Sequence, residues 1–309
     1  NIHSAELRSV SCASMPVIVK GRQEGGLNVG LKITGYAPNT NLGFDFQKPN
    51  ATTGMPLSMA SKLGLTSLVL DGRTFKEESF SSSSSTTIGG TTYTRTTTTT
   101  YTYQFPQLPT EHWQYVLDVL YTEMVKLFRE KHKIDFVPVE KVTGTTQYQT
   151  LFPADAANTK SAIQTTYKNT LRSSPEKLSE IFGSISSNQT SNVPIVNMMK
   201  EADVDGLISI TLKMTVGADK NDKVILSPQL HFSMAGRDEN NANKQGTYVI
   251  GLIGGAGVPF NGDAVKNDKR ALVEACSIPQ LIKALDYALT TTKAKEVEFG
   301  YDAIWSIGK

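Results

Sequence analysis

The segment "GLIGGAG", residues 251–257, is the stretch whose composition most suggests ligand chemistry. A glycine-rich loop can hold a phosphate group when a helix follows it, because the helix N-terminus presents free N–H groups to the anion. The glycines that would line such a loop are Gly251, Gly254, Gly255 and Gly257. Pro259 and Gly262 in the following "VPFNGD" argue against a helix. We therefore expect a flexible loop, with a small-ligand cleft beside it as an alternative.

The histidines and acidic residues predict no metal centre, and we expect no cofactor. No two of the four histidines have the spacing of paired ligands on one helix face. They are His3, His112, His132 and His231. Four aspartates fall in predicted loops, but the Asp-x-Asp-x-Asp-Gly pattern of a calcium loop is absent. They are Asp219, Asp222, Asp263 and Asp268, and solvated turns explain them.

The serines give no sign of nucleophilic catalysis. The sequence contains no Gly-x-Ser-x-Gly elbow, and nothing singles out one serine beside a histidine and an aspartate. We therefore predict no catalytic residue. A hydrolase whose site is assembled from dispersed residues remains an alternative. It would require a deep pocket lined by ionisable groups with shifted pKa values.

The threonine-rich stretch "TTIGGTTYTRTTTTTYTYQF", residues 86–105, has the alternation of a β-strand. From residue 91 onward every even position up to 102 is threonine, whereas the aromatic residues and the arginine occupy odd positions. A strand sends alternate residues to opposite faces. "IGG" supplies a turn, and "ESFSSSSST" supplies the partner strand. We predict a long Ser/Thr-rich β-hairpin over residues 79–105 that protrudes from the domain or extends its sheet.

One face of this hairpin would carry the residues best suited to an interface. They are Tyr93, Arg95, Tyr101 and Tyr103, with Phe105 on the same face. Aromatic and arginine side chains are common anchors of protein interfaces. The alternative is that this face packs on the domain's own core.

The hydrophobic periodicity predicts the remaining elements. We expect helices at 109–133 with Thr110 as N-cap, at 173–185, at 193–202, and at 277–293 with a Ser277–Gln280 capping box. Strands are expected at 15–21, 27–36, 64–75 and 134–142, and in a meander over 204–253. The tail at 296–307 is expected to be a closing strand or a docked segment. Residues 37–62 are predicted to be a long loop or a loosely ordered excursion, and residues 156–172 helical or mixed. We predict one α+β domain over residues 1–309, in which long helices cover one face of a mixed, mainly antiparallel sheet.

Composition limits the partners and suggests a compartment. The net charge of +2 does not favour nucleic-acid binding. No apolar run is long enough for a transmembrane helix, although peripheral or lipid-anchored membrane association stays open. Because the chain begins with Asn1, we expect that a signal segment was removed. Cys12 and Cys276 are too few for a disulfide scaffold, and they are either paired or buried as free thiols.

Residues 108–295 carry a resemblance to a known family. A strand with Val-Pro occurs in "IDFVPVEKVTGTTQYQTLF", and a helix leads through "ADVDGLI" into a strand in "NMMKEADVDGLISITLKMTV". The region is similar to the periplasmic α+β domain of curli-secretion (CsgG-type) lipoproteins and to the N-terminal domain of TolB. The resemblance implies a bacterial cell-envelope location and a binding or assembly role. No catalytic residue carries over, because these domains are not enzymes, and the first hundred residues have no counterpart in them.

These observations lead to one main functional expectation. We expect a non-catalytic protein of the periplasm or outer membrane that binds a protein partner or associates with itself through the hairpin. The hydrolase and the small-ligand-binding protein are the two alternatives.

Overall fold

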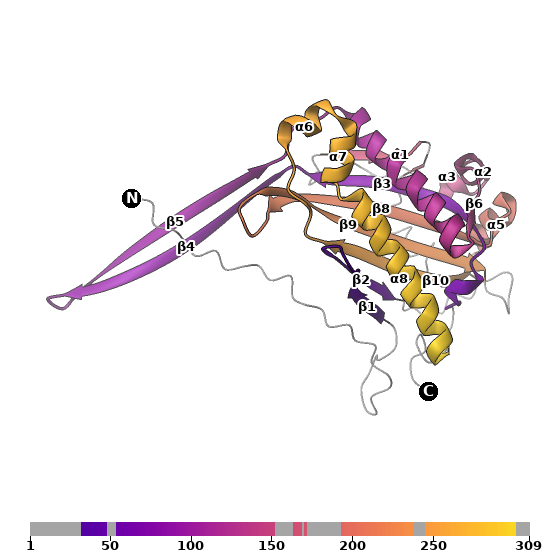
Figure 1. Cartoon of the computed structure of the whole chain (residues 1–309), viewed down its shortest axis with the longest axis horizontal. Helices are drawn as coiled ribbons and strands as arrows, with labels where there is room; N and C mark the ends of the chain where they lie inside the picture. Colours follow the sequence, from indigo (N-terminus) through magenta and orange to yellow (C-terminus); the bar gives the residue numbers. More distant parts are fainter. Residues whose placement is uncertain are drawn as a thin grey trace.

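The computed structural model describes residues 32–47, 54–151, 163–168, 170–171, 193–237 and 245–300. Within these residues a mixed sheet of eight strands forms the centre of the molecule (Figure 1). The strands follow the order β1-β2-β10-β9-β8-β3-β6, and β7 pairs with β3 as well. The strands are β1 (Lys32–Tyr36), β2 (Leu42–Gln47), β3 (Lys62–Arg73), β6 (Asp135–Phe136), β7 (Ile163–Thr166), β8 (Gly206–Ala218), β9 (Val224–Arg237) and β10 (Gln245–Gly255).

Most strand pairs are antiparallel, which confirms the predicted α+β class. The predicted meander over 204–253 forms β8, β9 and β10, and each of these strands pairs antiparallel with the next. Among the described strands the parallel pairs are those that β3 makes, with β8 on one side and β6 on the other. A strand in this position is covered on both faces, which explains why residues 63–72 of β3 are all buried.

Two long helices lie on the same face of the sheet, as predicted. They are α1 (Thr110–Leu127) and α8 (Ile278–Phe299), with the short α6 (Gly262–Asn267) and α7 (Lys269–Ala275) beside them (Figure 1). Buried residues of α1, such as Trp113 and Leu117, join Phe46 of β2 and Phe232 of β9 in the main hydrophobic core. The other face is covered at one end by α2 (Val139–Thr143), α3 (Tyr148–Leu151) and α5 (Val193–Ala202), which form a second core with Leu207 and Ala235.

Several local predictions were wrong. Residues 37–62 are not one long loop, because they include β2 and a 3₁₀ turn, η1 (Leu57–Met59). The strand expected at 134–142 is limited to β6, and α2 begins immediately after Pro138, which occupies its N-cap position. Part of the segment expected to be helical or mixed forms β7. The segments 15–21 and 173–185, Cys12, His3 and the tail from 301 lie outside the described residues.

The helix starts also differ from their predicted caps. Pro109 occupies the N-cap position of α1, and Thr110 is already helical. Ser277 does precede α8, but its φ is 56° and its side chain makes no capping bond. The reason is that Ser277 also ends the preceding turn, since its N–H donates to the carbonyl of Glu274 at 2.8 Å. The predicted capping box is therefore absent. Asp263 and Asp268, expected in loops, lie in α6 and at the N-cap of α7.

The glycine-rich segment is a strand rather than a flexible loop. Gly251, Gly254 and Gly255 belong to β10, which lies between β2 and β9 inside the sheet. Gly251 is in register with both Phe46 and Phe232, whose rings contact each other at 5.2 Å between centroids. Gly257, just after the strand, lies against the backbone of Leu226. These glycines allow neighbouring side chains and backbone to pack closely against the strand. The sequence pattern alone does not distinguish glycines with this role from glycines of a flexible loop. The helix α6 does begin at Gly262, contrary to expectation, because Asn261 caps it.

This packing makes a testable prediction for Gly251→Ala. A Cβ atom there would lie 2.2 Å from Cζ of Phe232, so the aromatic pair would have to move. We expect the free energy of unfolding to fall by about 1–3 kcal/mol, the usual cost of overpacking a core. The matched control is Gly217→Ala in β8, where no atom lies within 4 Å of the added Cβ, and we expect a change within about 0.5 kcal/mol. Equal effects in chemical denaturation would contradict this role of Gly251.

Candidate interaction hairpin

The predicted hairpin exists and forms a sheet of its own. Its strands, β4 (Phe75–Ile88) and β5 (Thr91–Gln104), pair with each other and with no third strand among the described residues. Figure 1 shows this ribbon extending far from the helices and the main sheet. The predicted hairpin is therefore present. Of the two arrangements predicted for it, the structure has the protruding one, and the prediction that it extends the main sheet is wrong.

The tip of the hairpin is a two-residue turn of glycines. Ile88 pairs with Thr91, and the intervening Gly89 and Gly90 have φ values of 60° and 81°. Two consecutive positive φ angles define the turn whose twist matches that of the flanking strands, and glycine adopts them without steric cost. This turn sets the register along the whole ribbon.

One face of the ribbon is a ladder of hydroxyl groups. Five cross-strand pairs bring a β4 hydroxyl to 2.8–3.0 Å from a β5 threonine hydroxyl. The pairs are Ser79–Thr100, Ser81–Thr98, Ser83–Thr96, Ser85–Thr94 and Thr87–Thr92. Cross-strand Ser/Thr hydrogen bonds stabilise strand pairing. The ladder therefore orders a ribbon that has no hydrophobic core in its outer part.

The opposite face carries the predicted interaction residues, but at two different levels. Tyr93 and Arg95 lie toward the tip and are exposed, with 61% of Tyr93 accessible to solvent. Tyr101 and Tyr103 lie near the base and are only partly exposed. Partial burial, followed by the negative charge of Glu78, raises the pKa of Tyr103 above its ordinary value. The tyrosine face thus packs partly on the body at its base and is free at its tip.

Two apolar residues of this face were not among the predicted interaction residues. Phe80 is 55% exposed, and its ring contacts that of Tyr101 at 5.9 Å between centroids. Ile88 is exposed beside the turn. The signal was present in the sequence, because a turn at Gly89 and Gly90 places even positions of β4 on the tyrosine face.

The outer ribbon is almost uncharged. From Ser79 to Gln104, Arg95 is the only ionisable group apart from tyrosine hydroxyls. The remaining charges of the hairpin lie near its base, where Lys76 forms an ion pair with Glu78. Charged side chains, and lysine above all, are the usual protection of an exposed strand edge. The outer ribbon lacks that protection.

Both strands of the hairpin are anchored in the core. β3 leads through Thr74 directly into β4, and the N–H of Phe105, just after β5, donates to the carbonyl of Thr74 at 2.8 Å. The side chain of Phe105 is fully buried and contacts the rings of Trp113 and Phe260. The base is therefore held on both sides, which fixes where the ribbon leaves the body.

The other candidate residues are not brought together. Within the described residues no group of three or more His, Cys, Asp or Glu side chains could hold a metal ion. Asp219 accepts hydrogen bonds from the N–H groups of Asn221 and Lys223 in a turn, as expected for a solvated loop. His231 lies next to Gln229 on β9, and His132 contacts Asp286. Cys276 is a buried free thiol, and burial raises its pKa, so it is not poised as a nucleophile.

Comparisons with known proteins add no further assignment. No protein-family model matches the chain, and no curated protein or solved structure is significantly similar to it. Among the described helices, none is both long enough and apolar enough to cross a membrane.

The anchor at the hairpin base can be tested with Phe105→Ala. Removing this buried ring leaves a cavity beside Trp113 and Phe260, and we expect a loss of about 3–5 kcal/mol in the free energy of unfolding. Phe75→Ala is the control, because Phe75 stands at the same base but is 55% exposed. We expect it to change stability by no more than about 0.5 kcal/mol. Urea denaturation of both variants measures the difference, and similar losses would argue against Phe105 as the anchor.

Proposed function

We propose that this chain is a non-catalytic bacterial cell-envelope protein with an interaction or assembly role, and that the β4–β5 hairpin is its contact element. The observation that carries the proposal is the isolated ribbon itself. Its two strands of 14 residues leave the outer edges of both β4 and β5 without a partner strand in the described chain. Each edge presents a row of backbone N–H and C=O groups that another strand can complete.

The physical chemistry of the ribbon favours pairing with another chain. An isolated two-stranded hairpin is only marginally stable in water, and a third strand from a partner adds a further ladder of backbone hydrogen bonds to it. The outer ribbon also has no charged side chain other than Arg95 to oppose an approaching strand. A second copy of this chain satisfies these conditions, because its own ribbon is equally extended and equally low in charge.

The side chains support a division of roles along the ribbon. The Ser/Thr ladder offers repeated, nearly identical positions, so it gives little sequence discrimination by itself. Tyr93, Arg95 and Ile88 lie near the tip, where large side chains can set the register of a partner. In this proposal the strand edges supply affinity and the tip residues supply specificity.

The envelope location rests on two lines of support. The first is the resemblance of residues 108–295 to periplasmic domains of curli-secretion lipoproteins and of TolB. The second is a composition low in charge and rich in Ser, Thr, Asn and Gln. Neither the hydrolase nor the small-ligand-binding alternative gains a specific observation. His132 is buried beside Asp286. Of the glycines proposed for a ligand loop, Gly251, Gly254 and Gly255 are strand residues, and Gly257 packs against the backbone of Leu226.

A shortened hairpin provides the test. Residues 81–98 are replaced by Asn-Gly, so that Phe80 and Thr99, which pair in the register, are joined by a two-residue turn. Because the removed residues are exposed, we expect the unfolding temperature to be nearly unchanged. We expect the intact chain to self-associate in analytical ultracentrifugation and the shortened chain to be monomeric. An intact chain that stays monomeric, or a shortened chain that associates equally well, would contradict self-pairing.

A second variant separates side-chain recognition from edge pairing. Tyr93→Ser with Arg95→Ser keeps both strands and both edges but removes the large side chains near the tip. We expect weaker but persistent association, since the backbone edges remain. Complete loss of association in this variant would instead assign the affinity to the tyrosine face.

A further inference from the structure

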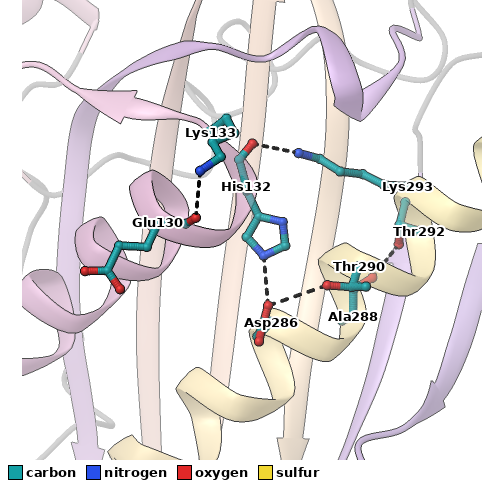
Figure 2. Close-up of polar contacts among 8 residues, drawn as sticks. All are labelled: Glu130, His132, Lys133, Asp286, Ala288, Thr290, Thr292 and Lys293. Carbon is teal, nitrogen blue, oxygen red and sulfur yellow. Dashed lines mark hydrogen bonds and ion pairs between the residues drawn. The ribbon is translucent and has the colours of Figure 1, made fainter.

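The end of α1 departs from regular α-helical geometry where it meets α8. Residues Phe128–His132 form a π-helical turn, η2, that ends at Lys133 with a left-handed φ of 60°. Such turns are rare, and they occur often at functional sites. Figure 2 shows that this turn directs the imidazole of His132 toward α8. The His132 side chain is only 3% exposed, and its Nε2 lies 3.1 Å from Oδ1 of Asp286.

Three successive polar contacts hold α8 in place from Asp286 onward. Besides Asp286, the Nζ of Lys293 donates to the backbone carbonyl of His132 at 3.1 Å (Figure 2). One turn further, the buried carboxylate of Glu296 accepts a hydrogen bond from the N–H of Leu57 at 3.0 Å. The contacts of Asp286 and Lys293 connect α8 to η2, and the contact of Glu296 connects it to η1. Both η1 and η2 are far from α8 in the sequence. His132 therefore takes part in two of these contacts: its side chain contacts Asp286, and its backbone carbonyl accepts the hydrogen bond from Lys293.

The surroundings of His132 oppose its protonation overall. Burial is the largest effect and lowers the pKa of His132, and the positive charge of Lys293 lowers it further. Asp286 acts in the opposite direction through its charge and its hydrogen bond, while Lys131 adds a smaller lowering effect. Lys293 is itself half-buried, and burial lowers its pKa. The folded arrangement is therefore built for a neutral imidazole.

We propose that His132, Asp286 and Lys293 form an acid-sensitive clasp, and that acidification releases the part of α8 from Asp286 to Phe299 from η2. This inference concerns the body of the molecule and is independent of the hairpin's proposed role. The released segment would include Tyr287, whose ring contacts Phe44 of β2, and Glu296 with its bond to η1. Release would uncover part of the apolar face of β2.

The direction follows from proton linkage. When α8 is open, His132 is solvated and titrates at its ordinary pKa of about 6.5. When α8 is closed, the pKa is lower, so the open form binds more protons as the pH falls below that value. The clasp is therefore complete above about pH 6.5 and weakens below it. If the closed form stays neutral, the opening equilibrium rises by about tenfold between pH 7.5 and pH 5.5.

Hydrogen exchange followed by mass spectrometry tests the clasp on the full chain. Exchange of peptides from α8 and η2 is compared at pH 7.5 and pH 5.5 after correction for intrinsic rates, with α5 as the internal reference. We expect the opening of α8 to increase several-fold, up to the tenfold limit, in the wild-type chain. We expect His132→Gln, which stays neutral and can still donate to Asp286, to show no such increase. An unchanged wild-type chain, or an equal increase in His132→Gln, would overturn the proposal.

Two further variants keep the test decisive if His132→Gln does not fold. Lys293→Gln can still donate to the carbonyl of His132 but removes the charge that opposes protonation, so we expect a smaller acid response than in the wild type. Asp286→Asn removes the charge that favours protonation, so its acid response should equal or exceed that of the wild type. If Lys293→Gln instead showed a larger acid response than Asp286→Asn, the proposal that the clasp depends on protonation of His132 would be contradicted.

Discussion

The pairing of β3 with β8 is the interaction on which the rest of the structure depends. β3 is buried along residues 63–72 and is the one described strand with parallel partners on both sides. A strand buried in this way must satisfy all its backbone groups internally. Even its bulge at Thr66 does so, because the Thr66 hydroxyl donates to the carbonyl of Ile208 and Tyr148 donates to the Thr66 carbonyl. Since β4 follows β3 with only Thr74 between them, this strand also fixes the origin of the hairpin.

The hairpin is held together by a different kind of force from the body. In the body, side chains from α1, α8 and the sheet interlock around aromatic rings, and glycine positions such as Gly251 provide room for those rings. In the outer ribbon there is no apolar interior, and a glycine turn with paired hydroxyls maintains the strands. The body is thus specified by shape, whereas the ribbon is specified by backbone geometry. A ribbon of this kind leaves its edges open to a partner.

The helices α1 and α8 are held by a large apolar core and by a few hydrogen bonds, whose geometry is more specific. α1 and α8 share the main core, yet the position of α8 from Asp286 onward depends on the polar contacts of His132, Lys293 and Glu296. Buried polar contacts contribute little net stability when satisfied but cost much when broken. The addition of one proton to such a contact can therefore change the free energy with which α8 is held against η2.

The sequence alone determined the features that arise from local periodicity. The segregation of Tyr93 and Tyr101 from the threonines, the two-glycine turn, and the core-facing stripe of α1 all follow from alternation or from a 3.6-residue period. The tertiary structure decided the rest. It placed Gly251, Gly254 and Gly255 in a strand and Gly257 just after it, because aromatic rings and backbone pack against these glycines. It also brought His132 to Asp286, which is 154 residues away in the sequence. It also left the ribbon free of the main sheet while burying Phe105 at its base. These features depend on contacts between residues that are far apart in the sequence, and a local pattern of residue types does not determine such contacts.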